Sequence, residues 1–249
     1  MDDISEPIRF AKALANDLEH PGPVLVGLYL HGSACLGGWN AITSDVDLLI
    51  VVEDAIERDA LVAISREVLA HARHCPGKGV ECSIVTRSQA GVIRNRWPFL
   101  AHFNSPDKLM PDIFPSPERN DPDLLMHYEV CHEVGIAISG PSTSEIFAPV
   151  QRETVLAYLA DELIWGLEHA PPRYALLNAC RAREYLGNNR IVSKVEAGDD
   201  ALRRPRKGDP LVEIEAALEE QRGGDAMSGL PDEVTDFIRD LSRDLRNAV

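Results

Sequence analysis

The chain has 249 residues, of which 45% are hydrophobic and 26% charged, and its formal net charge is −15. This length and composition predict a globular protein with one large domain or two modest ones. The acidic balance disfavours nucleic-acid binding, which needs a basic face that neutralises phosphates, and it favours a small cationic partner. No apolar run is long enough to span a bilayer, and the first residues, MDDISEPIRF, lack the features of a signal peptide. We therefore expect a cytoplasmic protein that binds no membrane.

Cysteine usage gives no sign of a structural or metal-binding framework. The five cysteines are odd in number and scattered, without a CxxC pair. This pattern argues against a disulfide scaffold and against a zinc knuckle. We expect buried or inert thiols.

The first part of the chain alternates helical and strand patterns. Apolar spacing over residues 7–19 predicts an amphipathic helix, and apolar runs predict strands at 24–30, 46–52 and 80–86. A short helix is expected from Ala34 to the break at 37–38, and a longer one over 56–74. Because strand, helix and strand follow one another, strands 46–52 and 80–86 are expected to be neighbours in one sheet.

The rest of the first half is less regular. Residues 87–120 are rich in Pro, Asn and Asp and are predicted to form loops and short helices that cover the site. A helix over 123–133 and a last edge strand over 136–139 follow. The composition changes after Pro149.

From Arg152 onward the pattern is helical. Helices are predicted from 152 to a break around 166–172, and over 174–186, 211–222 and 232–245. The expected architecture is α/β (α+β): a mixed sheet flanked by helices in residues 1–149, followed by an all-α helical bundle in residues 150–249.

Three acidic residues interrupt apolar strands. Asp45 and Asp47 lie at the start of strand 46–52 and, being two apart, project to one side, while Glu81 lies at the start of strand 80–86. Acids in such surroundings are costly to desolvate unless a cation lies between them, and carboxylates suit Mg²⁺. Two simpler interpretations stay open: Asp45 as a strand cap, and Glu81 as the partner of a core arginine.

A phosphate site is predicted directly upstream. Gly32 and Ser33 end the first strand and begin a helix, where free backbone N–H groups favour an anion. Glycine permits close approach and serine adds a donor. A Gly-Ser pair alone is a weak signal, since most such pairs are turns, but its spacing to Asp-x-Asp and to a third acid is that of the nucleotidyltransferase fold of DNA polymerase β.

The series HGSACLGGWNAITSDVDLLIVV, residues 31–52, resembles the aminoglycoside (3″)(9) adenylyltransferase family of that superfamily. Similarity continues at VECSIV around Glu81, at Ile113-Phe114, at SGPSTSEIFAPV (139–150), at Arg181 and at IVSK ending in Lys194. It covers most of the chain to about Leu202. The resemblance implies a nucleotidyltransferase domain followed by a helical domain that binds substrate and clamps ATP.

The resemblance also implies roles for individual residues. Glu81 would be the catalytic base and touch a metal, and Arg181 and Lys194 would clamp the β- and γ-phosphates. The metal ligands would be Asp45 and Asp47, with Glu81; the triphosphate contacts would be Gly32, Ser33 and Ser44. For Arg181 and Lys194 a solvated helix face is an equally open interpretation.

Substrate choice is expected to depend on the connection between the first two helices of the second domain. Family members that accept streptomycin carry a Trp and an Asp there. Here Trp165 lies at a corresponding place, the segment 166–172 has no Asp, and Glu168 is the acid that could serve instead. The missing Asp disfavours streptomycin as the substrate and leaves spectinomycin or another aminocyclitol as candidates. A simpler interpretation of Trp165, as a residue of the packed core, also stays open.

The resemblance thus implies an Mg²⁺-dependent monomeric enzyme that moves AMP from ATP to a hydroxyl of an aminoglycoside-type antibiotic and releases pyrophosphate. Two alternatives stay open. One is a nucleotidyltransferase with another small molecule or a protein as acceptor. The other is a non-catalytic, antitoxin-like binding protein, against which the length of the chain counts.

Overall fold

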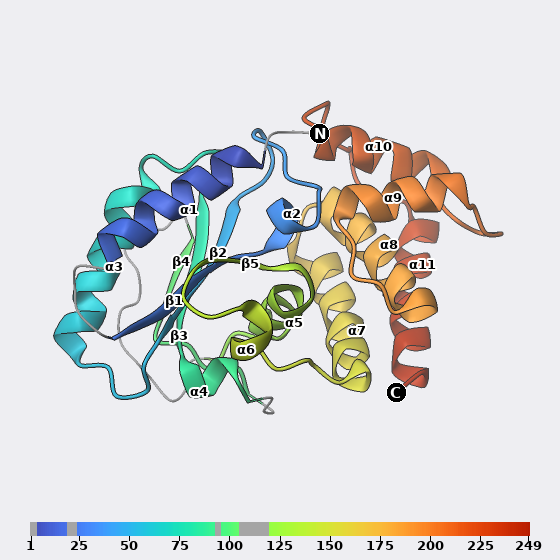
Figure 1. The fold of residues 1–249 in the computed structure, drawn as a ribbon. Coiled ribbons are helices and arrows are strands. Elements are labelled where there is room, and N and C mark those ends of the chain that lie inside the picture. The colour runs from blue at the N-terminus through green and yellow to red at the C-terminus, as the bar shows by residue number, and fades with distance from the viewer. Residues whose placement is uncertain (1–3, 19–23, 93–95, 105–119) are drawn as a thin grey trace. The chain divides into compact units, whose positions relative to one another are not determined.

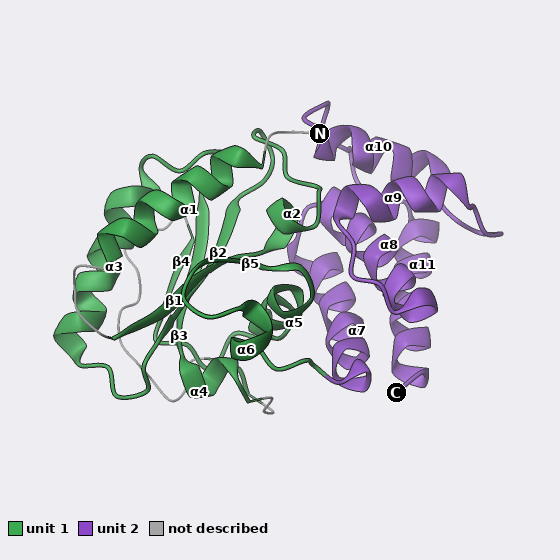
Figure 2. Ribbon diagram, in the orientation of Figure 1, with its two compact units in different colours: residues 1–150 green, residues 151–249 purple. Residues whose placement is uncertain are grey.

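A computed structural model describes residues 4–18, 24–92, 96–104 and 120–249 (Figure 1). They divide into two compact units, residues 1–150 and 151–249 (Figure 2); the sequence predicts a domain boundary between residues 149 and 150. In chain order the elements are α1 (Ser5–Leu18), β1 (Leu25–Leu30), α2 (Gly32–Cys35), β2 (Val46–Val52), α3 (Arg58–Ala72), β3 (Val80–Thr86), α4 (Arg87–Ala90), β4 (Ala101–Asn104), α5 (Leu124–Val134), β5 (Ile136–Ser139), α6 (Thr143–Ile146), α7 (Arg152–His169), α8 (Pro172–Asn188), α9 (Lys194–Arg203), α10 (Leu211–Gln221) and α11 (Asp232–Asn247). Among the described residues, no helix is long and apolar enough to cross a membrane.

The first unit contains a five-stranded mixed sheet in the order β4-β3-β2-β1-β5. β2 and β3 are parallel, as their connection through α3 predicts, whereas the other neighbouring pairs are antiparallel. β5 lies at an edge of the sheet, as predicted, and the structure pairs it with β1. The mixed sheet with helices and the following helices confirm the predicted fold class.

One face of the sheet is covered by α1 and α3 (Figure 1). Alternate residues of β2, from Val46 through Leu48 and Ile50 to Val52, enter this core together with the apolar stripe of α1. Because strand side chains alternate, Asp47 lies on the opposite face.

That opposite face carries a cluster of aromatic rings. Tyr29 of β1 and Tyr128 of α5 both pack against Phe147, with ring centroids 5.0 and 5.6 Å apart. Tyr128 also meets Trp97 edge-on at 5.7 Å. The cluster fixes α5 over the face to which Asp47 belongs.

Three features differ from the sequence predictions. Within 87–120, where loops and short helices are expected, residues 101–104 form a fourth strand, β4, which pairs with β3; residues 93–95 and 105–119, including Ile113 and Phe114, lie outside the described residues. Helix α9 was not predicted. The break predicted around 166–172 is present but shorter than expected, because α7 continues through the buried Gly166 to His169, leaving two residues before α8.

The second unit consists of helices α7 to α11. α11 packs against α7 and α8, while α9 and α10 pack against each other and against α8. Apolar residues at helical spacing, such as Val234, Ile238 and Leu245 of α11, are fully buried in this bundle. α8 is capped by Asn189, which adopts the left-handed conformation (φ 54°) common at helix C-termini.

Candidate active site

The register of two parallel strands brings the predicted acids together. Asp47 of β2 is paired with Glu81 of β3, so the two residues lie side by side on adjacent strands. Both belong to the sheet face opposite the α1–α3 core, since the residues on either side of each, such as Val46 and Val80, belong to that core. Asp45 is two residues before Asp47 and therefore projects to the same side.

Gly32 fits tightly against Asp47. Its φ is +62°, and a Cβ on Gly32 would lie 1.8 Å from the Asp47 Oδ2 atom. The next backbone N–H, that of Ser33, donates a hydrogen bond to the same oxygen at 3.3 Å. A glycine is therefore required here both by its backbone conformation and by the close approach of the carboxylate.

Ser44 is buried and stabilises the turn before β2. Its hydroxyl oxygen accepts a hydrogen bond from the backbone N–H of Asn40 at 3.1 Å, and the Ser44 N–H donates to the Asn40 carbonyl at 2.9 Å. This turn leads directly into Asp45 and Asp47. The structure thus gives Ser44 a clear local role, and its predicted triphosphate contact stays a prediction.

The acids make an electrostatically unfavourable group without a cation. Burial, followed by repulsion from Glu81, raises the pKa of Asp47 to about 7, with Asp45 adding to the effect. A divalent cation among these oxygens would remove the repulsion, and hard carboxylate oxygens are the donors that Mg²⁺ prefers. The donor set therefore fits magnesium.

Two histidines lie at the same place and were missed by the sequence analysis. The Nε2 atom of His127 on α5 is 3.9 Å from the Glu81 Oε1 atom, and its ring centroid is 4.7 Å from that of His31. His31 is buried, and its burial together with His127 holds its pKa well below the usual value. The two histidines lie on distant segments without metal-ligand spacing, so no sequence signal links them. Glu81 faces this histidine; the core arginine of the simpler interpretation is not among its ion-pair partners in the described residues.

In the helical unit, Arg181 and Lys194 are both half-buried and held by specific contacts. The Arg181 Nε–H donates to the Val192 carbonyl at 3.0 Å, which joins α8 to the segment before α9. Lys194 is the first residue of α9, and its ammonium lies 4.1 Å from the ring centroid of Tyr174, a cation–π contact. Each of the two cations is thus held by a specific contact, Arg181 by the Val192 carbonyl and Lys194 by the Tyr174 ring, and neither is simply a long side chain on a solvated helix face.

Trp165 and Glu168 lie on the last turns of α7 rather than in a loop. Trp165 is 49% exposed, stacks on His169 at 5.5 Å and meets Tyr174 edge-on at 6.2 Å. Glu168 is also exposed and, three residues on, lies on a neighbouring part of the same helix surface. An aromatic ring that is half exposed contributes less to packing than a core residue would, which leaves it available to a ligand.

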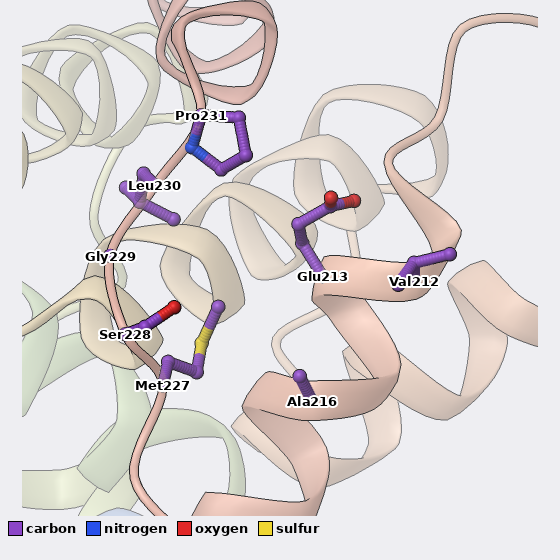
Figure 3. A pocket seen from close by; sticks show the side chains of 8 residues that line it. All are labelled: Val212, Glu213, Ala216, Met227, Ser228, Gly229, Leu230 and Pro231. Atoms are coloured by element: carbon purple, nitrogen blue, oxygen red, sulfur yellow. The ribbon is translucent and has the colours of Figure 1, made fainter.

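A pocket of about 380 Å³ lies elsewhere in the helical unit (Figure 3). It is open and is formed by α10 and the chain after it, with Met227, Leu230 and Pro231 facing Val212 and Ala216. Glu213 is its one carboxylate. None of the residues predicted to bind ATP, metal or substrate lines this pocket, so it is not the candidate active site.

The sheet order, with two acids paired across β2 and β3 beside a glycine loop, agrees with the nucleotidyltransferase fold that the motifs predict. The spectinomycin adenyltransferase AAD(9) from Enterococcus faecialis, whose crystal structure contains ATP and spectinomycin, shares this fold: the TM-score is 0.75 at 16% identity, over 98% of this chain and 100% of the other.

Comparison of the sequence with known proteins identifies individual enzymes to which the chain is similar. Residues 145–244 match the family model "Aminoglycoside adenylyltransferase, C-terminal domain". The chain is 25% identical to an aminoglycoside (3″)(9) adenylyltransferase of Klebsiella pneumoniae, over 92% of this chain and 91% of the relative, and 26% identical to a spectinomycin 9-adenylyltransferase of Staphylococcus aureus, over 73% and 72%. The chain is therefore similar to aminoglycoside adenylyltransferases over most of its length, which confirms the resemblance predicted from its motifs.

Proposed function

We propose that this chain is an Mg²⁺-dependent adenylyltransferase that transfers AMP from ATP to a hydroxyl of an aminocyclitol antibiotic of the spectinomycin type. The observation that carries the proposal is the pairing of Asp47 with Glu81 across parallel strands, with Asp45 on the same side. The similarity to adenylyltransferases over most of the chain supports both the donor and the acceptor class.

In the proposed reaction the acceptor hydroxyl oxygen forms a bond to the α-phosphorus of ATP, and the bond between this phosphorus and the pyrophosphate oxygen breaks. Asp45, Asp47 and Glu81 would hold Mg²⁺, which supplies positive charge for the entering and leaving oxygens. Glu81 takes the proton of the hydroxyl, for which its oxygen must come within about 3 Å of that group. Pyrophosphate leaves with the electron pair of the broken bond.

The remaining predicted residues would bind the two substrates. Gly32 and Ser33, and Ser44 in the turn, would contact the triphosphate, and the cations Arg181 and Lys194 would neutralise its β- and γ-phosphates. Trp165 would contact the antibiotic, with Glu168 available for an ammonium group. The net charge of −15 favours a cationic acceptor in the same way.

The choice between streptomycin and spectinomycin is expected to depend on the surface of α7 that carries Trp165 and Glu168. Helix α7 extends to His169 and occupies most of the segment 166–172, so Trp165 and Glu168 lie on one helix rather than in a loop. The acid beside Trp165 is Glu168, and the segment contains no Asp. The similarity to spectinomycin 9-adenylyltransferases supports spectinomycin as the proposed acceptor.

Mass spectrometry tests the proposal directly. Protein, ATP and Mg²⁺ are incubated with spectinomycin, streptomycin and a panel of other aminoglycosides, and each antibiotic is weighed. We expect spectinomycin to gain one AMP and pyrophosphate to appear in equal amount. Absence of any adduct across the panel would refute the proposed acceptor class, and an adduct on streptomycin alone would refute the proposed specificity.

A further inference from the structure

His127 is the basic side chain that faces the acidic group of the candidate site. It lies in the first turns of α5, and its side chain is 20% exposed, against 26% for Glu81. Its Nε2 atom is 3.9 Å from the Glu81 Oε1 atom, which is too long for a hydrogen bond but well within the range of a charge–dipole or charge–charge attraction.

The His127 ring packs against His31, whose backbone is hydrogen-bonded to strand β2. The rings of His127 and His31 lie 4.7 Å apart at 43°, and His31 is only 2% exposed. The backbone N–H of His31 donates to the Asp47 carbonyl at 3.0 Å. His127 is therefore fixed relative to β2, the strand that carries Asp47, and α5 is fixed by the packing of Tyr128 on Phe147.

The contact geometry shows how His127 can act on Glu81. An imidazole nitrogen 3.9 Å from the Glu81 Oε1 atom places the ring beside this carboxylate, and the ring is itself packed against His31. A fixed ring beside Glu81 limits the rotamers that the flexible Glu81 side chain can adopt.

We propose that His127 is a positioning residue that orients the Glu81 carboxylate for proton transfer. The inference rests on the proposed function, because it assumes that Glu81 takes the hydroxyl proton. It assigns no direct contact between His127 and substrate. A group that acts through Glu81 should affect the chemical step and leave ATP binding unchanged.

The test compares H127A and H127Q with the wild type and with H102A. His102 is a matched control, because it is a half-buried histidine on the neighbouring strand β4 whose ring nitrogen meets the Ser83 hydroxyl at 2.9 Å instead of a carboxylate. We expect H127A to lower kcat about tenfold and to change the KM for ATP by less than about twofold. H127Q, which keeps a polar N–H of similar reach, should recover at least about a third of the kcat that H127A loses. H102A should stay within about twofold of the wild type.

A double-mutant cycle with E81Q separates positioning from general damage to the fold. If His127 acts through Glu81, H127A lowers the residual rate of E81Q by less than about twofold, since the two changes are not additive. An equal, additive loss in both backgrounds, or a kcat for H127A and H127Q near that of the wild type, overturns the inference while leaving AMP transfer intact. If the wild type itself transfers AMP to no acceptor, the proposed function fails, and the role assigned to His127 fails with it.

Discussion

The two units position their candidate residues by different means. In the first unit, backbone register decides: Asp47 and Glu81 meet because β2 and β3 pair in parallel, and Gly32 packs against Asp47 because its loop directly follows β1. In the second unit, side-chain contacts decide: Arg181 is tied to the Val192 carbonyl and Lys194 lies over Tyr174. A substitution in the site fixed by strand register should therefore cost much activity, whereas a substitution in the site held by side-chain contacts should cost less.

The largest effect is expected for D47N. Replacing one carboxylate by an amide removes a metal ligand and its charge, and we expect kcat to fall by at least about a thousandfold, several kcal/mol of transition-state stabilisation. Steady-state assays of AMP transfer measure the loss. D59N, an exposed position on α3, is the matched control and should leave the rate unchanged.

The same substitution should stabilise the metal-free protein at pH 8. The folded-state pKa of Asp47 is raised from 3.8 to about 7, so ionising this carboxyl costs folding free energy; the cost is full above about pH 7 and decreases as the pH falls toward 3.8. In EDTA we expect the Tm of D47N to exceed that of the wild type by about 2–4 °C at pH 8, corresponding to about 1 kcal/mol. The difference should shrink at pH 5.5. An equal Tm difference at both pH values would show that the pKa of Asp47 is not raised in the folded protein.

E81Q is expected to slow transfer strongly while leaving a measurable residual rate and the fold intact. The amide cannot accept the hydroxyl proton, so kcat should fall about 10²- to 10⁴-fold. ATP binding, followed by isothermal titration calorimetry, should persist because Asp45 and Asp47 remain. Normal turnover by E81Q would show that another group is the base.

K194A tests the helical unit. Loss of one cation from the polyphosphate should raise the KM for ATP about tenfold with a smaller change in kcat, and it should leave the KM for the antibiotic unaltered. K207A removes an exposed lysine of the same unit and is its control. If K194A and K207A behave alike, Lys194 is a structural residue held by Tyr174.

W165A is expected to have the smallest effect. Because the ring is 49% exposed, its removal should change the Tm by less than about 2 °C while raising the KM for spectinomycin about 3- to 8-fold, the equivalent of about 0.6–1.2 kcal/mol of lost aromatic contact. A large fall in Tm with an unchanged KM would mean that Trp165 serves packing alone.

The difference between the units also explains what could be predicted from sequence. Strands β2 and β3 have the predicted bounds, because their apolar runs are unbroken and bounded by turn residues. The pairing of Asp47 with Glu81 then follows from the strand-helix-strand order. The strand β4 could not be foreseen, since Ala101–Asn104 is short and polar in alternate positions and gains its stability from β3.

Side-chain neighbours were harder to predict than backbone elements. The start of the predicted break at Gly166 rested on intrinsic propensity, yet α7 continues through this glycine, which lies against Ala175 of α8. Likewise, His31 and His127 meet only because α5 folds back over the sheet. Such contacts depend on tertiary packing, which leaves no periodic signal in one sequence.

The central claim is that Asp45, Asp47 and Glu81 together hold a divalent cation with ATP. Electron paramagnetic resonance of Mn²⁺ in the presence of ATP tests it most directly, because bound and free Mn²⁺ are distinguished without any turnover. We expect the wild type and D59N to bind Mn²⁺·ATP alike and D47N to bind at least about tenfold more weakly. Equal affinity of D47N and the wild type would contradict the account.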